Sequence, residues 1–132
     1  MPPIHQPAKQ AELSAISIRS DKKYDLILCI STLEHVGWDE NPRDADKTLK
    51  AVEQIRNLLA DNGIAFITLP VGYNDDLIKH LENGRLRFTE QYYMKRITKE
   101  QWVQCKKEEL KDVKYNSPYG CANGLIIGLI KK

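Results

Sequence analysis

The sequence predicts an α/β fold, and two observations support that prediction. The first is a pair of short segments, Tyr24–Ile30 and Ile64–Leu69, that are almost continuously apolar. Strands of this kind are typical of a parallel sheet that helices cover on both faces. The second is a stripe of apolar residues at helical spacing between them: Ala45, Leu49, Val52, Ile55 and Leu59. A strand, a helix and a strand in this order predict a βαβ unit with a right-handed crossover.

The chain has 132 residues, which predicts one domain over residues 13–132 behind a flexible arm at residues 1–12. The arm is polar and contains Pro2, Pro3 and Pro7, and Leu13–Ile18 then forms a short apolar segment that fits a strand. Tyr24–Ile30 is the first strong element. A buried helix is its alternative interpretation, but its length and its isoleucine content favour a strand.

The helix that follows is expected to begin at Asn41 and Pro42, since Asn caps helices and Pro suits the first helical position. Asp61–Gly63 should end it, with Asn62 or Gly63 in the left-handed conformation. The second strand, Ile64–Leu69, stops at Pro70, and Asp75–Leu81 fits a short helix.

The C-terminal third has weaker patterns. Leu86–Ile97 mixes basic and aromatic residues without a clear period, and packing of its aromatics is a simpler interpretation than contact with nucleic acid. Thr98 and Gln101 suggest a capping box for a helix that runs to Lys107. A strand over Lys111–Tyr115 is expected to pair antiparallel with the apolar segment Leu125–Ile130.

Composition narrows the class of protein. Twenty basic and eighteen acidic residues give a net charge of +2, which does not indicate a nucleic-acid partner. No run of 18 apolar residues occurs, so no membrane helix is expected, and residues 1–10 do not resemble a secretory signal. Cys29, Cys105 and Cys121 form no C-x-x-C pair, which argues against a disulfide framework or a zinc site. A reducing, cytoplasmic setting is the expectation.

Tyr24–Val36, with the sequence YDLILCISTLEHV, resembles the fourth strand of class I S-adenosylmethionine-dependent methyltransferases. In that family an aromatic–Asp pair opens the strand, and a Leu-Glu-His-hydrophobic run often follows it. Leu58–Thr68 is similar to the family's next element, a helix end, a Gly turn and the fifth strand. The resemblance covers about residues 20–132. It implies a partial Rossmann-like methyltransferase sheet, mostly parallel, with an antiparallel strand pair near the C-terminus.

The sequence also departs from this family. The family has a Gly-rich loop after its first strand and an acidic residue after its second, and both contact the cofactor. Here no G-x-G occurs, and no glycine precedes Gly37. The chain therefore resembles the C-terminal half of the fold, and Tyr24–Ile30 should lie at a sheet edge. Because a bare apolar edge promotes aggregation, we expect Leu13–Ile18, a second copy in a homodimer, or a separate partner chain to cover it.

The resemblance also implies roles for particular residues. His35 would act as catalytic base beside Glu34, since an imidazole can take up a proton at neutral pH. Ser31 and Thr32 would approach the methionine part of S-adenosylmethionine, and a substrate pocket would be lined by Gly72, Tyr73 and Asn74. Each role has a plain alternative. For His35 it is packing against the following loop, with Glu34 solvated. For Ser31 and Thr32 it is ordinary strand-end hydrogen bonding, and for residues 72–74 it is a simple turn. The plain alternative is favoured in all three cases.

No metal is predicted, because Ser31 stands where family members that act on phenols carry a carboxylate ligand. The predicted function is methyl transfer from S-adenosylmethionine to an oxygen or nitrogen of a small-molecule substrate. The alternative is a non-catalytic methyltransferase-like remnant that binds a protein partner, or itself, through the exposed sheet edge.

Overall fold

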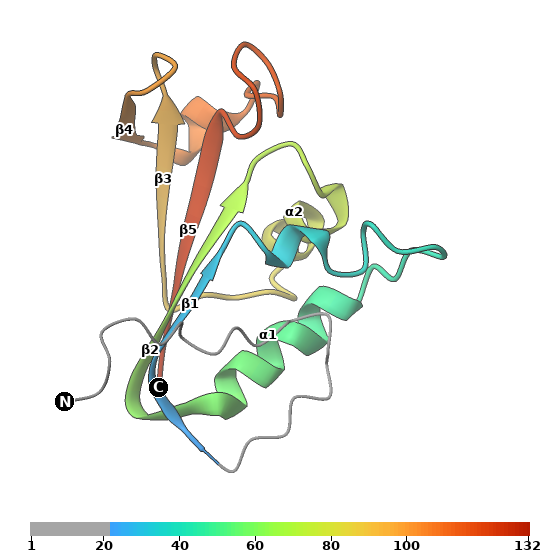
Figure 1. Cartoon of the computed structure of the whole chain (residues 1–132), viewed down its shortest axis with the longest axis vertical. Helices are drawn as coiled ribbons and strands as arrows, with labels where there is room; N and C mark the ends of the chain where they lie inside the picture. Colours follow the sequence, from blue (N-terminus) through green and yellow to red (C-terminus); the bar gives the residue numbers. More distant parts are fainter. Residues whose placement is uncertain (1–21) are drawn as a thin grey trace, which may run out of the picture.

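A computed structural model describes residues 22–132, so the predicted arm at residues 1–12 and the predicted strand Leu13–Ile18 lie outside the described residues. Five strands form one sheet in the order β1-β2-β5-β3-β4 (Figure 1). Their bounds are β1 Tyr24–Ile30, β2 Leu59–Pro70, β3 Glu90–Arg96, β4 Trp102–Cys105 and β5 Gly124–Lys131. The α-helices are α1 Lys47–Leu58 and α2 Asp75–Glu82, and two short 3₁₀ helices are η1 Leu33–His35 and η2 Lys107–Leu110.

The prediction of a mixed α/β fold is confirmed, but the sheet is not mostly parallel. Only β1 and β2 form a parallel pair, while β2–β5, β5–β3 and β3–β4 are antiparallel. The reason is the position of β5. It lies between β2 and β3, which run in one direction, and it opposes both. The antiparallel partners of β5 are therefore β2 and β3, and the predicted pairing with a strand over Lys111–Tyr115 is wrong.

Helix α1 begins later than predicted. Its N-cap is Asp46 instead of Asn41, because the preceding segment folds back and the Asp44 amide donates to the Gly37 carbonyl at 2.9 Å. The helix ends at Leu58, and β2 starts at once with Leu59, five residues before the predicted start at Ile64. Asn62 takes the left-handed conformation that the sequence predicts there, with φ 65°.

The predicted helix over residues 98–107 is wrong, because these residues form the turn and second strand of a hairpin. The Thr98 hydroxyl does accept a hydrogen bond from the Gln101 amide at 3.2 Å, as in a helix cap. However, the Ile97 amide donates to the Gln101 carbonyl at 2.9 Å, which closes a turn and leads into β4. Helix α2 and strand β5 lie within one residue of their predicted bounds at each end.

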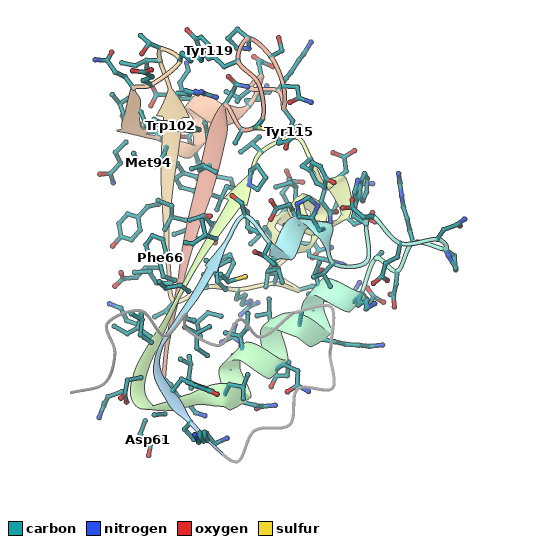
Figure 2. All side chains as sticks on the ribbon, in the orientation of Figure 1. Asp61, Phe66, Met94, Trp102, Tyr115 and Tyr119 are labelled. Atoms are coloured by element: carbon teal, nitrogen blue, oxygen red, sulfur yellow. The ribbon has the colours of Figure 1, made fainter. Side chains whose placement is uncertain are left out.

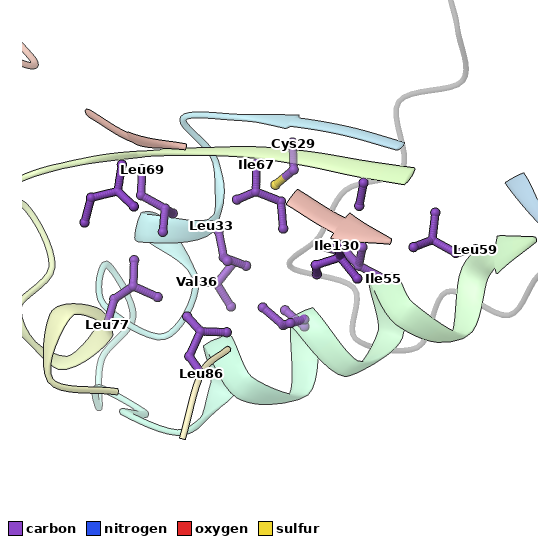
Figure 3. Close-up of a cluster of buried hydrophobic side chains, with 14 residues drawn as sticks. Cys29, Leu33, Val36, Ile55, Leu59, Ile67, Leu69, Leu77, Leu86 and Ile130 are labelled. Carbon is purple, nitrogen blue, oxygen red and sulfur yellow. The ribbon is translucent and has the colours of Figure 1, made fainter. Parts of the chain in front are cut away.

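The two faces of the sheet differ. On one face, α1, α2 and η1 cover the core, which Figure 3 shows between the sheet and the helices; its fully buried members include Leu33, Ile55, Ile67, Leu69 and Leu77. The other face, here called the open face, carries Leu26, Leu28 and Ile30 of β1, which are 58%, 62% and 52% exposed. The prediction that this strand is buried on both faces therefore fails in the described structure.

Strand β1 lies at the edge of the sheet, as predicted. Within residues 22–132 it pairs only with β2. Because β1 and β2 are parallel, their last residues, Ile30 and Pro70, lie at the same end of the sheet. The segments that follow these strands, residues 31–39 and 71–74, are therefore brought together there. In the same described part of the chain, no helix has the length and apolar character needed to cross a membrane.

Candidate functional site

The candidate site is built around His35, at the end of η1. The His35 Nδ1 atom lies 2.6 Å from the Asp39 Oδ2 atom and 3.0 Å from the Tyr73 hydroxyl oxygen. The Tyr73 hydroxyl in turn donates to the Asp39 Oδ1 atom at 2.6 Å. One carboxylate thus holds both an imidazole and a phenol, from the two segments that follow β1 and β2. The side chains of His35 and Asp39 are 47% and 46% exposed, so the cluster is open to solvent.

Hydrogen bonding fixes the protonation of this cluster. The bond from Tyr73, followed by the bond from His35, lowers the pKa of Asp39, so this carboxylate stays ionised. The same bond raises the pKa of Tyr73 to about 12, so the phenol stays protonated and acts as the donor. In a neutral His35 ring whose Nδ1 atom donates to Asp39, the Nε2 atom carries the lone pair. The arrangement can therefore orient an imidazole base.

Asp39 was not predicted as a site residue, although its spacing from His35 could have indicated it. It stands four residues after His35, and residues at this spacing meet on one side of a helical turn. Tyr115 was also missed. Its ring lies edge-on to Tyr73 with a centroid separation of 5.1 Å, while His35 and Tyr73 are 4.8 Å apart. Tyr115 follows η2, in a segment whose pattern suggested a strand, and Figure 2 labels it near this end of the sheet.

Glu34 is buried, at 2% exposure, so the alternative of a solvated Glu34 is wrong. Its Oε2 atom lies 3.7 Å from the Nε2 atom of His35, and its Oε1 atom has no hydrogen-bond partner in the described structure. Burial is the main reason why the pKa of Glu34 is raised, and the nearby Asp39 charge adds to it. The structure therefore places a buried carboxyl behind the exposed imidazole.

Ser31 and Thr32 lie between β1 and η1 and make strand-end hydrogen bonds. The Ser31 amide donates to the Thr68 hydroxyl at 3.0 Å and to the Thr68 carbonyl at 3.2 Å. The Thr32 hydroxyl donates to the Ile30 carbonyl at 2.9 Å. Both residues are exposed at the end of β1. The plain interpretation of these two residues accounts for the bonds that they make.

Gly72 and Asn74 shape the turn after β2. Gly72 has φ +86°, and a Cβ atom on it would lie 2.9 Å from the Tyr115 amide nitrogen, so glycine permits the close approach of the two segments. The buried Asn74 side chain caps α2 by accepting from the Leu77 amide at 3.0 Å. It also donates to the Glu34 carbonyl at 2.8 Å. Of the three residues predicted to contact substrate, Tyr73 is therefore the one in contact with the His35 cluster.

A separate hollow lies between α1 and the segment at residues 84–87. It is an open groove of about 470 Å³, and its lining includes Leu49, Val52, Arg56, Arg85 and Arg87 but neither His35 nor Tyr73. Among residues 22–132, no group of three or more His, Cys, Asp or Glu side chains is arranged to hold a metal ion.

The similarities that comparisons with known proteins find are structural. No family model matches the chain, and no curated protein matches it. The structure is similar to the crystal structure of an S-adenosylmethionine-dependent methyltransferase from Clostridium acetobutylicum, with 15% sequence identity and a TM-score of 0.43. The match covers 94% of this chain and 63% of that chain, so this chain spans less than two thirds of its length.

Proposed function

We propose that the chain is the acceptor-binding half of an S-adenosylmethionine-dependent methyltransferase that acts on an oxygen or nitrogen of a small molecule. The observation that supports this most is the Asp39–His35 pair at the carboxyl end of β1, joined by Tyr73 from the end of β2. Ligands of open α/β sheets bind at this end of the strands. The Leu33-Glu34-His35 run that resembles the methyltransferase family lies in the same place.

The proposed role of His35 is proton removal. S-adenosylmethionine supplies an electrophilic methyl group, and the acceptor hydroxyl or amine must lose its proton as it is methylated. The Nε2 atom of His35 would take that proton, while Asp39 holds the Nδ1–H and stabilises the imidazolium that forms. Tyr73 keeps Asp39 in position through its second oxygen. A positioned base of this kind typically contributes about 10²–10⁴-fold to the rate.

In this proposal the described residues supply only part of the cofactor site. At the end of β1, the Ser31 amide already donates to Thr68 of β2, and the Thr32 hydroxyl already donates to Ile30 of β1. The sequence has no G-x-G, so it lacks the loop through which backbone approaches the cofactor. The proposal therefore requires that further contacts to S-adenosylmethionine come from outside the described residues, with Ser31 and Thr32 at the edge of the completed site.

Titration calorimetry with S-adenosylmethionine tests this function. We expect weak but measurable binding to the purified chain, and the absence of binding heat at millimolar ligand would contradict the proposal. His35→Ala should leave the binding affinity within about threefold but lower methyl transfer by about 100-fold or more. A His35→Ala protein with full transfer activity would remove His35 from the mechanism.

A second candidate function is that of a non-catalytic module that binds a protein partner. The observation in its favour is the free edge of β1, which within residues 22–132 is hydrogen-bonded on one side only. Such an edge can add a strand from another chain. This candidate predicts no binding of S-adenosylmethionine, so the calorimetric result separates the two functions.

A further inference from the structure

The open face of the sheet has a defined set of side chains. Residues paired across neighbouring strands point to the same face, and the pairs Leu28–Phe66 and Phe66–Leu129 extend from β1 across β2 to β5. A second row runs from Ile30 through Thr68 and Ile127 to Tyr92 on β3. Figure 2 shows Phe66 on the side of the sheet away from α1.

This face is apolar and exposed to solvent. Leu26, Leu28, Ile30, Ile64 and Tyr92 are between 38% and 62% exposed. Two charged residues also lie on this face, since Glu90 pairs with Leu129 and Lys131 pairs with Ile64. They form an ion pair at 2.8 Å, and Tyr92 donates to Glu90. A contiguous apolar patch of this kind marks an interaction surface in a protein of this size.

We propose that this open face is the contact surface of a homodimer, in which two copies of the chain pack sheet against sheet. The face suits a copy of itself, because its apolar side chains can face each other across a two-fold axis and its charged residues Glu90 and Lys131 are already paired with each other. Packing leaves α1 and α2 on the outside of each copy and gives four layers in the order helix, sheet, sheet, helix. Facing sheets in such packings lie about 10 Å apart with interdigitated side chains.

The available area is sufficient for a weak dimer. If each of the five exposed side chains contributes roughly 100 Å², one copy buries about 500 Å² and two copies about 1,000 Å², which is the lower bound for a specific interface. The half-buried Phe66, Ile127 and Leu129 add to this area. Pairing of two β1 edges would instead double the width of the apolar face and leave it in water. Contact between faces is therefore favoured over contact between edges.

Sedimentation velocity of the full chain tests the proposal. We expect a species with the mass of two copies whose fraction falls on dilution from about 100 μM to about 1 μM, as for a weak interface. A chain that stays monomeric throughout this range would overturn the proposal, and so would large aggregates without a two-copy species.

A pair of variants shows which surface is used. Leu28→Asp places a carboxylate at the centre of the open face and should weaken dimerisation by about 100-fold or more. Val103→Asp is the matched control, because Val103 is 41% exposed but pairs with Lys95 and so lies on the opposite face of the sheet. It should change the dimer constant by less than about threefold. Circular dichroism confirms that both variants fold, and equal effects of the two would overturn the proposal.

This inference does not depend on methyl transfer. If Leu28→Asp forms a folded monomer that still binds S-adenosylmethionine, both proposals stand. If the wild-type dimer forms but no cofactor binds, only the functional proposal fails. Hydrogen exchange tests whether residues outside the described range make the contact instead. In a dimer through the open face, exchange of the β1 and β5 peptides should slow as the concentration of the chain rises, while exchange of the α1 peptide stays constant.

Discussion

Side chains from the same strands meet opposite environments on the two faces of the sheet. On the face toward α1, Ile67 of β2 is 0% exposed and Cys29 of β1 is 3% exposed. On the open face, Leu28, the neighbour of Cys29 in the chain, is 62% exposed. Both strands are apolar on both faces, as expected for strands covered by helices on each side, but α1 and α2 cover only one face. An apolar strand residue therefore contributes to stability only where a second layer removes it from water.

The largest effect should come from truncating a side chain on the covered face. Ile67→Ala should lower the free energy of unfolding by about 3 kcal/mol, since it leaves a cavity among buried neighbours. Leu28→Ala should lower it by less than about 1 kcal/mol at a dilution where the chain is monomeric. Urea denaturation monitored by circular dichroism measures both changes. Equal losses would show that one copy of the chain covers both of its faces.

A smaller effect is expected when the carboxylate that accepts a hydrogen bond from a tyrosine is removed. One such tyrosine lies in the candidate site and another lies on the open face. Tyr73 donates to Asp39, which raises the pKa of Tyr73 to about 12, and Tyr92 donates to Glu90, which raises its pKa as well. Asp39→Asn should return the pKa of Tyr73 toward about 10, the ordinary value for tyrosine. Glu90→Gln, the matched control, should lower the pKa of Tyr92 and leave that of Tyr73 unchanged. NMR titration of ring-labelled tyrosine resolves the two.

The same bond makes stability depend on pH at both ends of the range. Because the folded state holds the Tyr73 proton more tightly, its contribution is lost as the pH rises from about 10, the unfolded value, to about 12. The pKa of Asp39 is lowered on folding, so its contribution is present above the ordinary carboxyl pKa and is lost as the pH falls. A Tyr73 that titrates near 10 in the wild-type chain would show that it does not donate to Asp39.

The sequence predicted the elements that have a single strong pattern. β1 and β5 are clear from their apolar runs, and α2 lies within one residue of its predicted bounds. The β3–β4 hairpin was not predicted, because Thr98 and Gln101 close a hairpin turn with the same side chains that would cap a helix. The antiparallel position of β5 between β2 and β3 depends on long-range pairing, which local patterns do not encode.

Prediction of the candidate site was partial for a related reason. His35 and Tyr73 were found from their places after two strands, and the structure brings them within hydrogen-bond distance. Asp39 and Tyr115 were not found, because they join the cluster through a short helical turn and through a loop without regular structure. Asn74, predicted to contact substrate, instead has both ends of its amide bonded within the protein.

The most direct test of the proposed function follows the imidazole signals of the full chain by ¹⁵N–¹H NMR while S-adenosylmethionine is added. His80, buried on α2 with its Nε2 atom 2.6 Å from the Ala45 carbonyl oxygen, is an internal control. If the acceptor side of a methyltransferase site surrounds His35, its signals should shift and saturate with ligand, while those of His80 stay in place. Signals of His35 that do not move at millimolar S-adenosylmethionine would contradict the account.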